Sequence, residues 1–331
     1  MLKNIKKIIL LIGINMIFVL NIGAAKGNEI IIPEGLKPGD TIGLIAPANY
    51  TGDSAQYEID YLINRGFNIV YGKSFYSRWY GFGGTDDVRV QDINEMFANK
   101  NIDAIFAIRG GYGSIRFIDK LNYDVIRKNP KIFSGFSDIT TLLIAINEKT
   151  GLVTYHGPMS SNFKDIPIET ENSFNKTFME KGKFNLLEFD DTFIIMKGGR
   201  GKGKITGGNL SLIVASLGTP YEIDTDGKIL FIEETGEASY RVDRMFQQLK
   251  LAGKLKNLKG IILGDFRGAK KADPTDMTLD EVFYNNFGNL NIPVIRDFKS
   301  GHVRPFITVP IGADAEIDTY KREVIIEKAV K

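Results

Sequence analysis

The chain of 331 residues contains no cysteine, and this absence removes several kinds of chemistry. Disulfide bonds, a thiol nucleophile and a thiolate metal site are all excluded, so either a reducing or an oxidising compartment is compatible with the sequence. Histidine is also scarce, since only His156 and His302 occur. There is no H-E-x-x-H motif, and mainly carboxylates remain as metal ligands. We therefore expect neither a metal nor another cofactor.

The chain also lacks a strong charge of either sign. The 42 Lys and Arg residues nearly balance the 40 Asp and Glu residues, which leaves a formal net charge of +2. The basic residues are dispersed and form no stripe, so nucleic acid is not an expected partner. A hydrophobic fraction of 43% is typical of globular proteins, and the length suffices for two domains.

The first 25 residues have the layout of a secretory signal peptide. Lys3, Lys6 and Lys7 give a positive start, residues 8–22 are mostly apolar, and small residues lead up to Ala25. The apolar core of about 15 residues is short for a membrane span of roughly 20. We expect cleavage after Ala25 and export to the periplasm or cell envelope. The alternative is an uncleaved segment that anchors the protein.

Strands and helices alternate between residues 29 and 160, which predicts an α/β domain with a parallel sheet covered on both faces. The expected strands are residues 41–48, 68–71, 105–108 and 131–136, and the expected helices are 57–65, 86–99 and 139–148. Thr85 or Asp86 is expected to cap the second helix, and Ser137 or Asp138 the third.

Residues 161–203 differ, because they are polar and have few long apolar runs. We interpret them as a crossover linker with a short strand at 193–196. Residues 204–331 form a second expected domain. Its expected helices are residues 209–217 and 240–251, and its expected strands are 229–232 and 260–264, followed by a strand, a turn and a strand within 306–326.

A glycine-rich turn from Arg109 to Gly113 leads from the strand at 105–108 to Ser114. Glycine permits the backbone angles of a tight turn, and residues 115–121 have the apolar spacing of a helix. A strand, a sharp turn, a serine and a helix form the geometry of a nucleophile elbow. The alternatives are a phosphate-binding glycine loop and a plain turn.

A serine nucleophile needs a base and a group that orients the base. His302 lies in a loop after a predicted strand, and His156 follows another short strand, so both are candidates for the base. Glu233 and Glu234, at the end of an apolar strand, are candidates for the orienting carboxylate. The resulting order along the chain is Ser, Glu, His, which is known in one large class of hydrolases.

Several segments resemble the LD-carboxypeptidases, a family of serine peptidases that includes murein tetrapeptide carboxypeptidase and the microcin C immunity protein. The resemblance extends over most of the chain after residue 25. The segments that carry it are residues 39–48, 84–89, 109–114, 135–140, 156–159, 207–210, 231–237, 240–244 and 301–302.

The resemblance implies a catalytic triad of Ser114, Glu233 and His302. It also implies an N-terminal flavodoxin-like domain that carries the serine and a C-terminal swivelling β/β/α-type domain that carries the other two residues. The active site would lie in the cleft between them, and the protein would be a homodimer. The implied reaction releases terminal D-alanine from murein tetrapeptides.

Further site residues follow from the chemistry of such a reaction. The backbone amides of Gly111 and Ile115 are candidate oxyanion donors. Arg109 and Arg244 are candidates for binding the terminal carboxylate of the substrate. Two other functions stay open, namely hydrolysis of a peptide–nucleotide conjugate of the microcin C type and a non-catalytic role as an exported solute-binding protein.

Overall fold

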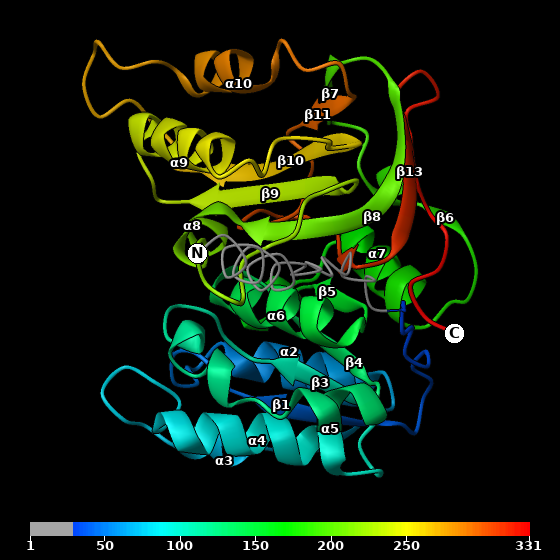
Figure 1. Cartoon of the computed structure of the whole chain (residues 1–331). Helices are drawn as coiled ribbons and strands as arrows, with labels where there is room; N and C mark the ends of the chain where they lie inside the picture. The colour runs from blue at the N-terminus through cyan, green and yellow to red at the C-terminus, as the bar shows by residue number, and fades with distance from the viewer. Residues whose placement is uncertain (1–28) are drawn as a thin grey trace, which may run out of the picture.

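The computed structural model describes residues 29–331, which form two β-sheets with helices around them (Figure 1). The predicted signal peptide, residues 1–25, lies outside the described residues. Within residues 29–331, no helix combines the length and the apolar character that crossing a membrane requires.

The first sheet has six strands in the order β12-β5-β4-β3-β1-β2. They are β1 (Thr41–Ile45), β2 (Asn68–Tyr71), β3 (Ala104–Ala107), β4 (Ile132–Gly135), β5 (Thr154–His156) and β12 (Val309–Ile311). β1 to β5 are parallel, and the order 2-1-3-4-5 is that of the flavodoxin-like fold. β3 and β4 are buried along their whole length, as expected for central strands of a covered parallel sheet. The predicted N-terminal fold is confirmed.

The strand β12 comes from the far end of the chain and pairs antiparallel with β5. The register places Val309 opposite His156 and Ile311 opposite Thr154. The C-terminal part of the sequence therefore supplies an edge strand of the first sheet.

Helices cover the first sheet, with α3, α4 and α5 on the outer face in Figure 1. The helices of this part are α2 (Ala55–Asn64), α3 (Lys73–Tyr76), α4 (Asp86–Ala98), α5 (Tyr123–Lys128) and α6 (Thr140–Thr150). The side chain of Thr85 accepts a hydrogen bond from the N–H of Val88, so the predicted cap of α4 is confirmed.

The second sheet has eight strands in the order β6-β14-β13-β8-β9-β10-β11-β7. They are β6 (Phe184–Asn185), β7 (Ile194–Lys197), β8 (Arg200–Asn209), β9 (Ile229–Thr235), β10 (Gly260–Arg267), β11 (Val294–Arg296), β13 (Asp314–Asp318) and β14 (Glu323–Ile326). The strands β8 to β11 run parallel. The first half of β8 pairs with β13 and the second half with β9, and Figure 1 shows how β8 curves to do so.

The helices of this second part are α7 (Ile168–Phe178), α8 (Leu210–Ala215), α9 (Ser239–Leu251) and α10 (Leu279–Phe287). The stretch 161–203 contains α7, β6, β7 and the start of β8. Phe178 of α7 packs against Phe106 of β3 at a centroid distance of 5.4 Å, whereas β6 and β7 are edge strands of the second sheet. The stretch thus passes from one sheet to the other and adds elements to both.

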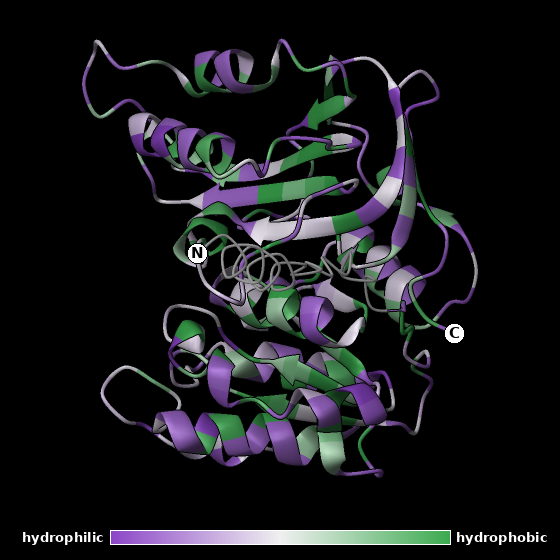
Figure 2. Ribbon diagram, viewed as in Figure 1, coloured by the Kyte–Doolittle hydropathy of each residue, from purple (hydrophilic) through white to green (hydrophobic). Residues whose placement is uncertain are grey.

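Helix α6 lies between the two sheets (Figure 1). Its side chains are buried on nearly all sides, including Leu142, Leu143 and Ile144. In Figure 2, hydrophobic residues concentrate on the central strands, whereas hydrophobic and hydrophilic residues alternate along the outer helices α4 and α9. Leu142 and Leu143 pack into the core of the first half and Ile144 into that of the second, so this apolar helix joins the two halves.

The helix expected after Ser114 does not form. Two short 3-10 turns, η1 (Ser114–Arg116) and η2 (Ile118–Lys120), are interrupted by Phe117 at φ −140°. The Tyr123 hydroxyl donates to the carbonyl of Ile118 at 2.6 Å, which occupies an acceptor that a continuing helix would use. The apolar side chains at this spacing are still buried, so the hydrophobic pattern was correct and the helix type was wrong.

Candidate active site

The loop between β3 and η1 has the glycine-rich turn of a nucleophile elbow, and Ser114, which follows the turn, is fully buried. Gly111 and Gly113 adopt φ values of 112° and 122°, in the region that favours glycine. A Cβ atom at Gly113 would lie 2.7 Å from the Phe82 ring and 2.8 Å from the guanidinium of Arg89. Glycine at 113 is therefore required both by the backbone angle and by the neighbouring side chains.

The carboxylate of Asp138 fixes the backbone of the elbow through hydrogen bonds. Its oxygens accept hydrogen bonds from the N–H groups of Gly113 at 3.2 Å and Ser114 at 2.9 Å. Burial raises the pKa of Asp138, although these hydrogen bonds and the charge of Arg89 oppose the rise. Asp138 was expected to cap the helix after β4, but neither it nor Ser137 makes a side-chain cap there. The cap prediction was wrong because the carboxylate is directed to the elbow instead.

Arg89 is a second support that sequence reasoning missed. Its side chain is fully buried, and it donates to the carbonyls of Pro47 at 3.0 Å and Gly113 at 3.1 Å while forming an ion pair with Asp86. Its guanidinium also lies 4.8 Å from the centroid of the Phe117 ring. Burial lowers the pKa of Arg89, and the ion pair with Asp86 opposes that shift. A buried cation therefore supports the elbow, although the sequence showed only an arginine within a predicted helix.

Glu233 and His302 meet in the second half of the molecule. Glu233 lies near the end of β9 with no exposed side-chain surface, and its Oε2 is 2.8 Å from Nδ1 of His302. Burial lowers the pKa of His302, but the hydrogen bond and charge of Glu233 outweigh it, with added contributions from Asp265 and Glu234, so the pKa rises above its ordinary value. A carboxylate on Nδ1 leaves Nε2 to face a substrate or nucleophile.

Glu234 points to a different environment. Its carboxylate accepts hydrogen bonds from the N–H and hydroxyl of Ser211 at 2.8 and 2.7 Å and from the N–H of Thr235 at 2.8 Å. Adjacent residues of a strand project to opposite faces, which separates the two glutamates. Of the two candidates, Glu233 contacts the imidazole, and Glu234 serves the start of α8.

The segment from Phe136 to Asp138 touches both halves of the predicted triad. The Phe136 ring lies 5.0 Å from the His302 ring, centroid to centroid, and the carbonyl of Asp138 accepts a 2.6 Å hydrogen bond from the Ser114 hydroxyl. Within residues 29–331, no hydrogen bond joins Ser114 to His302. Ser114 and His302 are thus linked through the Phe136–Asp138 segment, and the Ser114 hydroxyl is held by a backbone carbonyl.

His156, the other candidate base, is fully buried. Its ring packs against Phe136, Phe231 and Phe306, and neither ring nitrogen has a hydrogen-bond partner within the described part of the chain. Burial, aided by the charge of His302, lowers the pKa of His156 to about 3. A neutral ring that is enclosed by three phenylalanines and contacts neither Ser114 nor Glu233 in the described part of the chain packs as a core residue.

The two predicted oxyanion donors differ from their neighbours in the elbow. The N–H groups of Gly113 and Ser114 are already bound to Asp138. In contrast, the N–H groups of Gly111 and Ile115 have no partner among residues 29–331. Gly111 is exposed and Ile115 is half-buried.

The predicted carboxylate-binding arginines lie apart. Arg109 is exposed beside the elbow, with its guanidinium 5.7 Å from the Tyr50 ring, and Arg244 is exposed on α9. A third arginine was missed, because Arg267 donates to the carbonyl of His302 at 3.1 Å. Arg267 ends β10 opposite Thr235 of β9, so the available signal was an arginine at the end of an apolar strand.

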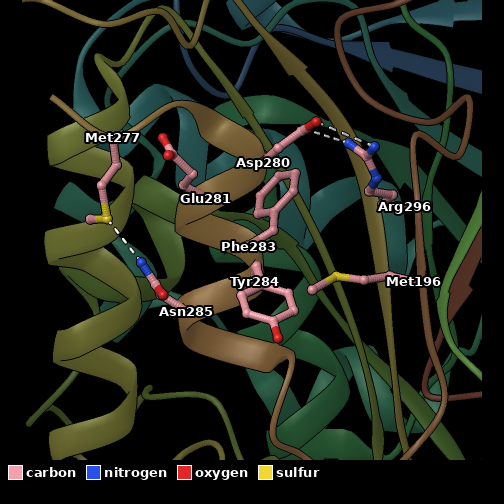
Figure 3. A pocket seen from close by; sticks show the side chains of 8 residues that line it. All are labelled: Met196, Met277, Asp280, Glu281, Phe283, Tyr284, Asn285 and Arg296. Carbon is pink, nitrogen blue, oxygen red and sulfur yellow. Dashed lines mark hydrogen bonds and ion pairs between the residues drawn. The ribbon is translucent and has the colours of Figure 1, made fainter.

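A pocket of about 490 Å³ lies elsewhere, between α10 and the strands β7 and β11 (Figure 3). It is lined by Phe283, Tyr284 and the Asp280–Arg296 ion pair, among others, and it includes none of the predicted site residues. Within residues 29–331, no group of three or more His, Asp or Glu residues is arranged to hold a metal ion.

Comparison with known proteins gives the same family for both halves of the chain. Residues 42–157 match the LD-carboxypeptidase N-terminal domain and residues 202–317 match the LD-carboxypeptidase C-terminal domain. The probable murein peptide carboxypeptidase of Bacillus subtilis is 38% identical over 304 residues, covering 90% of this chain and 95% of that protein. The microcin C7 self-immunity protein MccF of Escherichia coli is 29% identical, covering 88% and 94%.

Solved structures agree with these sequence relationships. Wild-type MccF without ligand superposes with a TM-score of 0.82 at 27% identity, covering 91% of this chain and all of that one. The muramoyltetrapeptide carboxypeptidase of Oxalobacter formigenes has a TM-score of 0.75 at 29% identity, covering 87% and 98%. The chain therefore belongs to the LD-carboxypeptidase family of serine peptidases.

Proposed function

We propose that this protein is a carboxypeptidase that releases the terminal D-alanine from murein tetrapeptides through a triad of Ser114, His302 and Glu233. The observation that carries the proposal is the hydrogen bond between Glu233 and His302, together with the Phe136–Asp138 segment that contacts both the His302 ring and the Ser114 hydroxyl. The names of the Bacillus and Oxalobacter relatives support murein peptides as the substrate class.

The reaction begins when the Ser114 hydroxyl rotates from the carbonyl of Asp138 toward Nε2 of His302. His302 takes the proton, and Oγ forms a bond to the carbonyl carbon that joins an L-centre to the terminal D-residue. Glu233 holds the ring tautomer and stabilises the imidazolium. The N–H groups of Gly111 and Ile115 bind the oxyanion, and removing one such donor typically costs about 100- to 1000-fold in rate.

The imidazolium of His302 then protonates the amine of the leaving D-alanine as the C–N bond breaks, and an ester to Ser114 remains. Water, deprotonated by His302, attacks this ester and releases the shortened peptide. Arg109 is the first candidate for binding the free carboxylate of the substrate, because it lies beside the elbow without an ion-pair partner among residues 29–331. Arg244 is the second candidate for this role.

Muropeptide digests with the wild type and with Ser114→Ala test the proposal. The wild type should convert tetrapeptide to tripeptide plus free D-alanine, and a fluorophosphonate should label Ser114. Ser239→Ala is a matched control, since Ser239 is equally buried and its hydroxyl has no partner within the described residues. Retained activity in Ser114→Ala would reject the nucleophile, and micromolar ligand binding without labelling would favour a solute receptor.

A second function within the same family is hydrolysis of a peptide–nucleotide conjugate. The likeness to MccF favours it, since MccF structures exist with glutamyl sulfamoyl guanosine and aspartyl sulfamoyl adenosine. A panel of murein peptides and aminoacyl sulfamoyl nucleosides would separate the two substrates by kcat/KM.

Export and dimerisation remain parts of the proposal. Intact-mass analysis of secreted protein should show a chain that starts after Ala25, and a mass that retains residues 1–25 would indicate an uncleaved anchor instead. Light scattering should give twice the chain mass for a homodimer.

A further inference from the structure

Four aromatic rings form a partly exposed surface beside the elbow, and we call them the aromatic platform: Trp79, Tyr80, Phe82 and Tyr112. The side chains of Trp79, Tyr80 and Tyr112 are 37%, 79% and 54% exposed. The ring centroids are separated by 4.9 Å from Trp79 to Tyr80, 5.9 Å from Trp79 to Phe82 and 5.7 Å from Phe82 to Tyr112. Single exposed aromatics are common, but contiguous ones mark binding surfaces.

The platform is rigidly joined to the elbow. The backbones of Trp79 and Phe82 exchange two hydrogen bonds of 3.1 and 3.0 Å, which closes a tight turn with Tyr80 at its tip. Tyr80 adopts φ 53°, an unfavourable conformation for a residue with a large side chain. Phe82 lies against Gly113, one residue before Ser114, so a molecule on these rings would adjoin the proposed nucleophile.

Two arginines lie over the ring of Tyr50, whose N–H donates to the carbonyl of Gly81 in the turn of the platform. The guanidinium of Arg78 lies 4.3 Å from the Tyr50 ring, and that of Arg109 lies 5.7 Å from the same ring. Neither arginine has an ion-pair partner within residues 29–331, whereas Arg116 beside Trp79 is bound to Asp86 at 3.0 Å. With Arg109 assigned to the terminal carboxylate, Arg78 is the cation that can bind a side-chain carboxylate of the peptide next to the platform.

We propose that the aromatic platform binds the amino-sugar of a muramoyl-peptide substrate; this inference rests on the proposed function. The electron-rich faces of aromatic rings attract the C–H groups on the face of a pyranose ring. In a muramoyltetrapeptide, three residues separate the sugar from the bond to be cut, and an extended chain of three residues spans at most about 10 Å. The ring centroids step outward by 5.7 Å from Tyr112 to Phe82 and by 5.9 Å from Phe82 to Trp79, which is the same scale as the length of the peptide.

Trp79 is the single tryptophan of the chain, so its fluorescence reports directly on the platform. The Ser114→Ala protein should be titrated with muramoyltetrapeptide and, separately, with the same tetrapeptide lacking the sugar. A blue shift of the emission with the muramoyl form, absent with the bare peptide, is the expected result. Identical spectra for both ligands at saturation would overturn the proposal.

Kinetics provide an independent test through the ratio of kcat/KM for the muramoyl form to kcat/KM for the bare tetrapeptide. Tyr80→Ala should lower this ratio by about 3- to 10-fold, the usual range for one aromatic stacking contact. Tyr320→Ala is the matched control, because Tyr320 is 72% exposed on the other half of the molecule, and its ratio should equal that of the wild type. An unchanged ratio in Tyr80→Ala would contradict the sugar site.

The two proposals fail in different ways. If the wild type releases D-alanine from neither substrate, the proposed function is wrong, while the Trp79 titration with the muramoyl compound still decides the platform. If Tyr80→Ala converts a dimer to a monomer and reduces both substrates equally, the platform is a subunit interface and the sugar proposal is wrong.

Discussion

The carboxylate of Glu233 occupies the space where a side chain at Gly301 would begin. A Cβ atom at Gly301 would lie 2.8 Å from Oε2 of Glu233, the oxygen that contacts His302. Gly301 also has φ 121°, where L-residues are strained. The glycine before His302 therefore allows the carboxylate and the imidazole to meet.

We expect Gly301→Ala to reduce kcat by at least about tenfold, because a methyl group would displace Glu233 from the ring it orients. Gly218→Ala is the control, since Gly218 has φ 78° and open space around its Cβ position. Both variants should lose roughly 1–3 kcal/mol of unfolding free energy from backbone strain. Steady-state kinetics and denaturant unfolding check this, and equal kcat values would show that Gly301 matters only to the backbone.

Asp138→Asn should weaken the elbow, because an amide can accept only one of the two backbone hydrogen bonds that the carboxylate accepts. The expected loss is about 1–3 kcal/mol in stability together with a fall in kcat. Asp92→Asn is matched, since buried Asp92 accepts from the N–H groups of Lys73 and Ser74 at 2.9 and 2.6 Å, away from the elbow. A comparable fall in kcat in both variants would refute a specific role for Asp138.

The pH dependence of kcat/KM should reflect His302, which must be neutral to accept a proton. Burial lowers the pKa of His302, but Glu233 and the neighbouring carboxylates raise it by more, so the pKa lies above its ordinary value. Activity should therefore increase as the pH rises through a midpoint above 6.5. Glu233→Gln should move this midpoint to lower pH and reduce kcat on the order of 10³- to 10⁴-fold. An unchanged midpoint in Glu233→Gln would show that Glu233 does not raise the pKa of His302.

His156→Leu should make the protein less sensitive to acid. The pKa of His156 is about 3 in the folded protein and near 6.5 in an unfolded chain, so the unfolded state gains a proton first as the pH falls. Unfolding free energy should therefore decrease between pH 6.5 and 3, by up to about 1.4 kcal/mol per pH unit. Urea unfolding at pH 7.5 and 5 should give a smaller pH difference for the variant; an equal difference would contradict this account.

Local sequence signals were sufficient for the strands β1 to β4 of the first sheet and for the cap of α4, and they limited the partner pair to Glu233 or Glu234 with His156 or His302. Apolar runs and glycine turns depend on residues adjacent in sequence, so they can be interpreted without tertiary information. The order Ser, Glu, His likewise needs only the positions of rare residues. The choice between Glu233 and Glu234 required the family resemblance, because both follow the same apolar strand.

The supports of the site could not be predicted in this way. Arg89 and Asp138 are charged, and charged residues are expected at the surface unless a partner from elsewhere in the fold satisfies them. Their partners, Pro47, Gly113 and Ser114, come from other loops, and only the fold brings them together. The aromatic platform was missed for the same reason, since Trp79 and Tyr112 are far apart in sequence.

The edge strand β12 has a consequence for how the protein is made. Residues 309–311 pair with β5, so the sheet that carries the nucleophile stays unfinished until nearly the entire polypeptide has left the ribosome. Until then β5 presents unpaired backbone groups, which other chains can bind. A truncated N-terminal half would keep that open edge, so the completed first sheet requires residues from both halves of the chain.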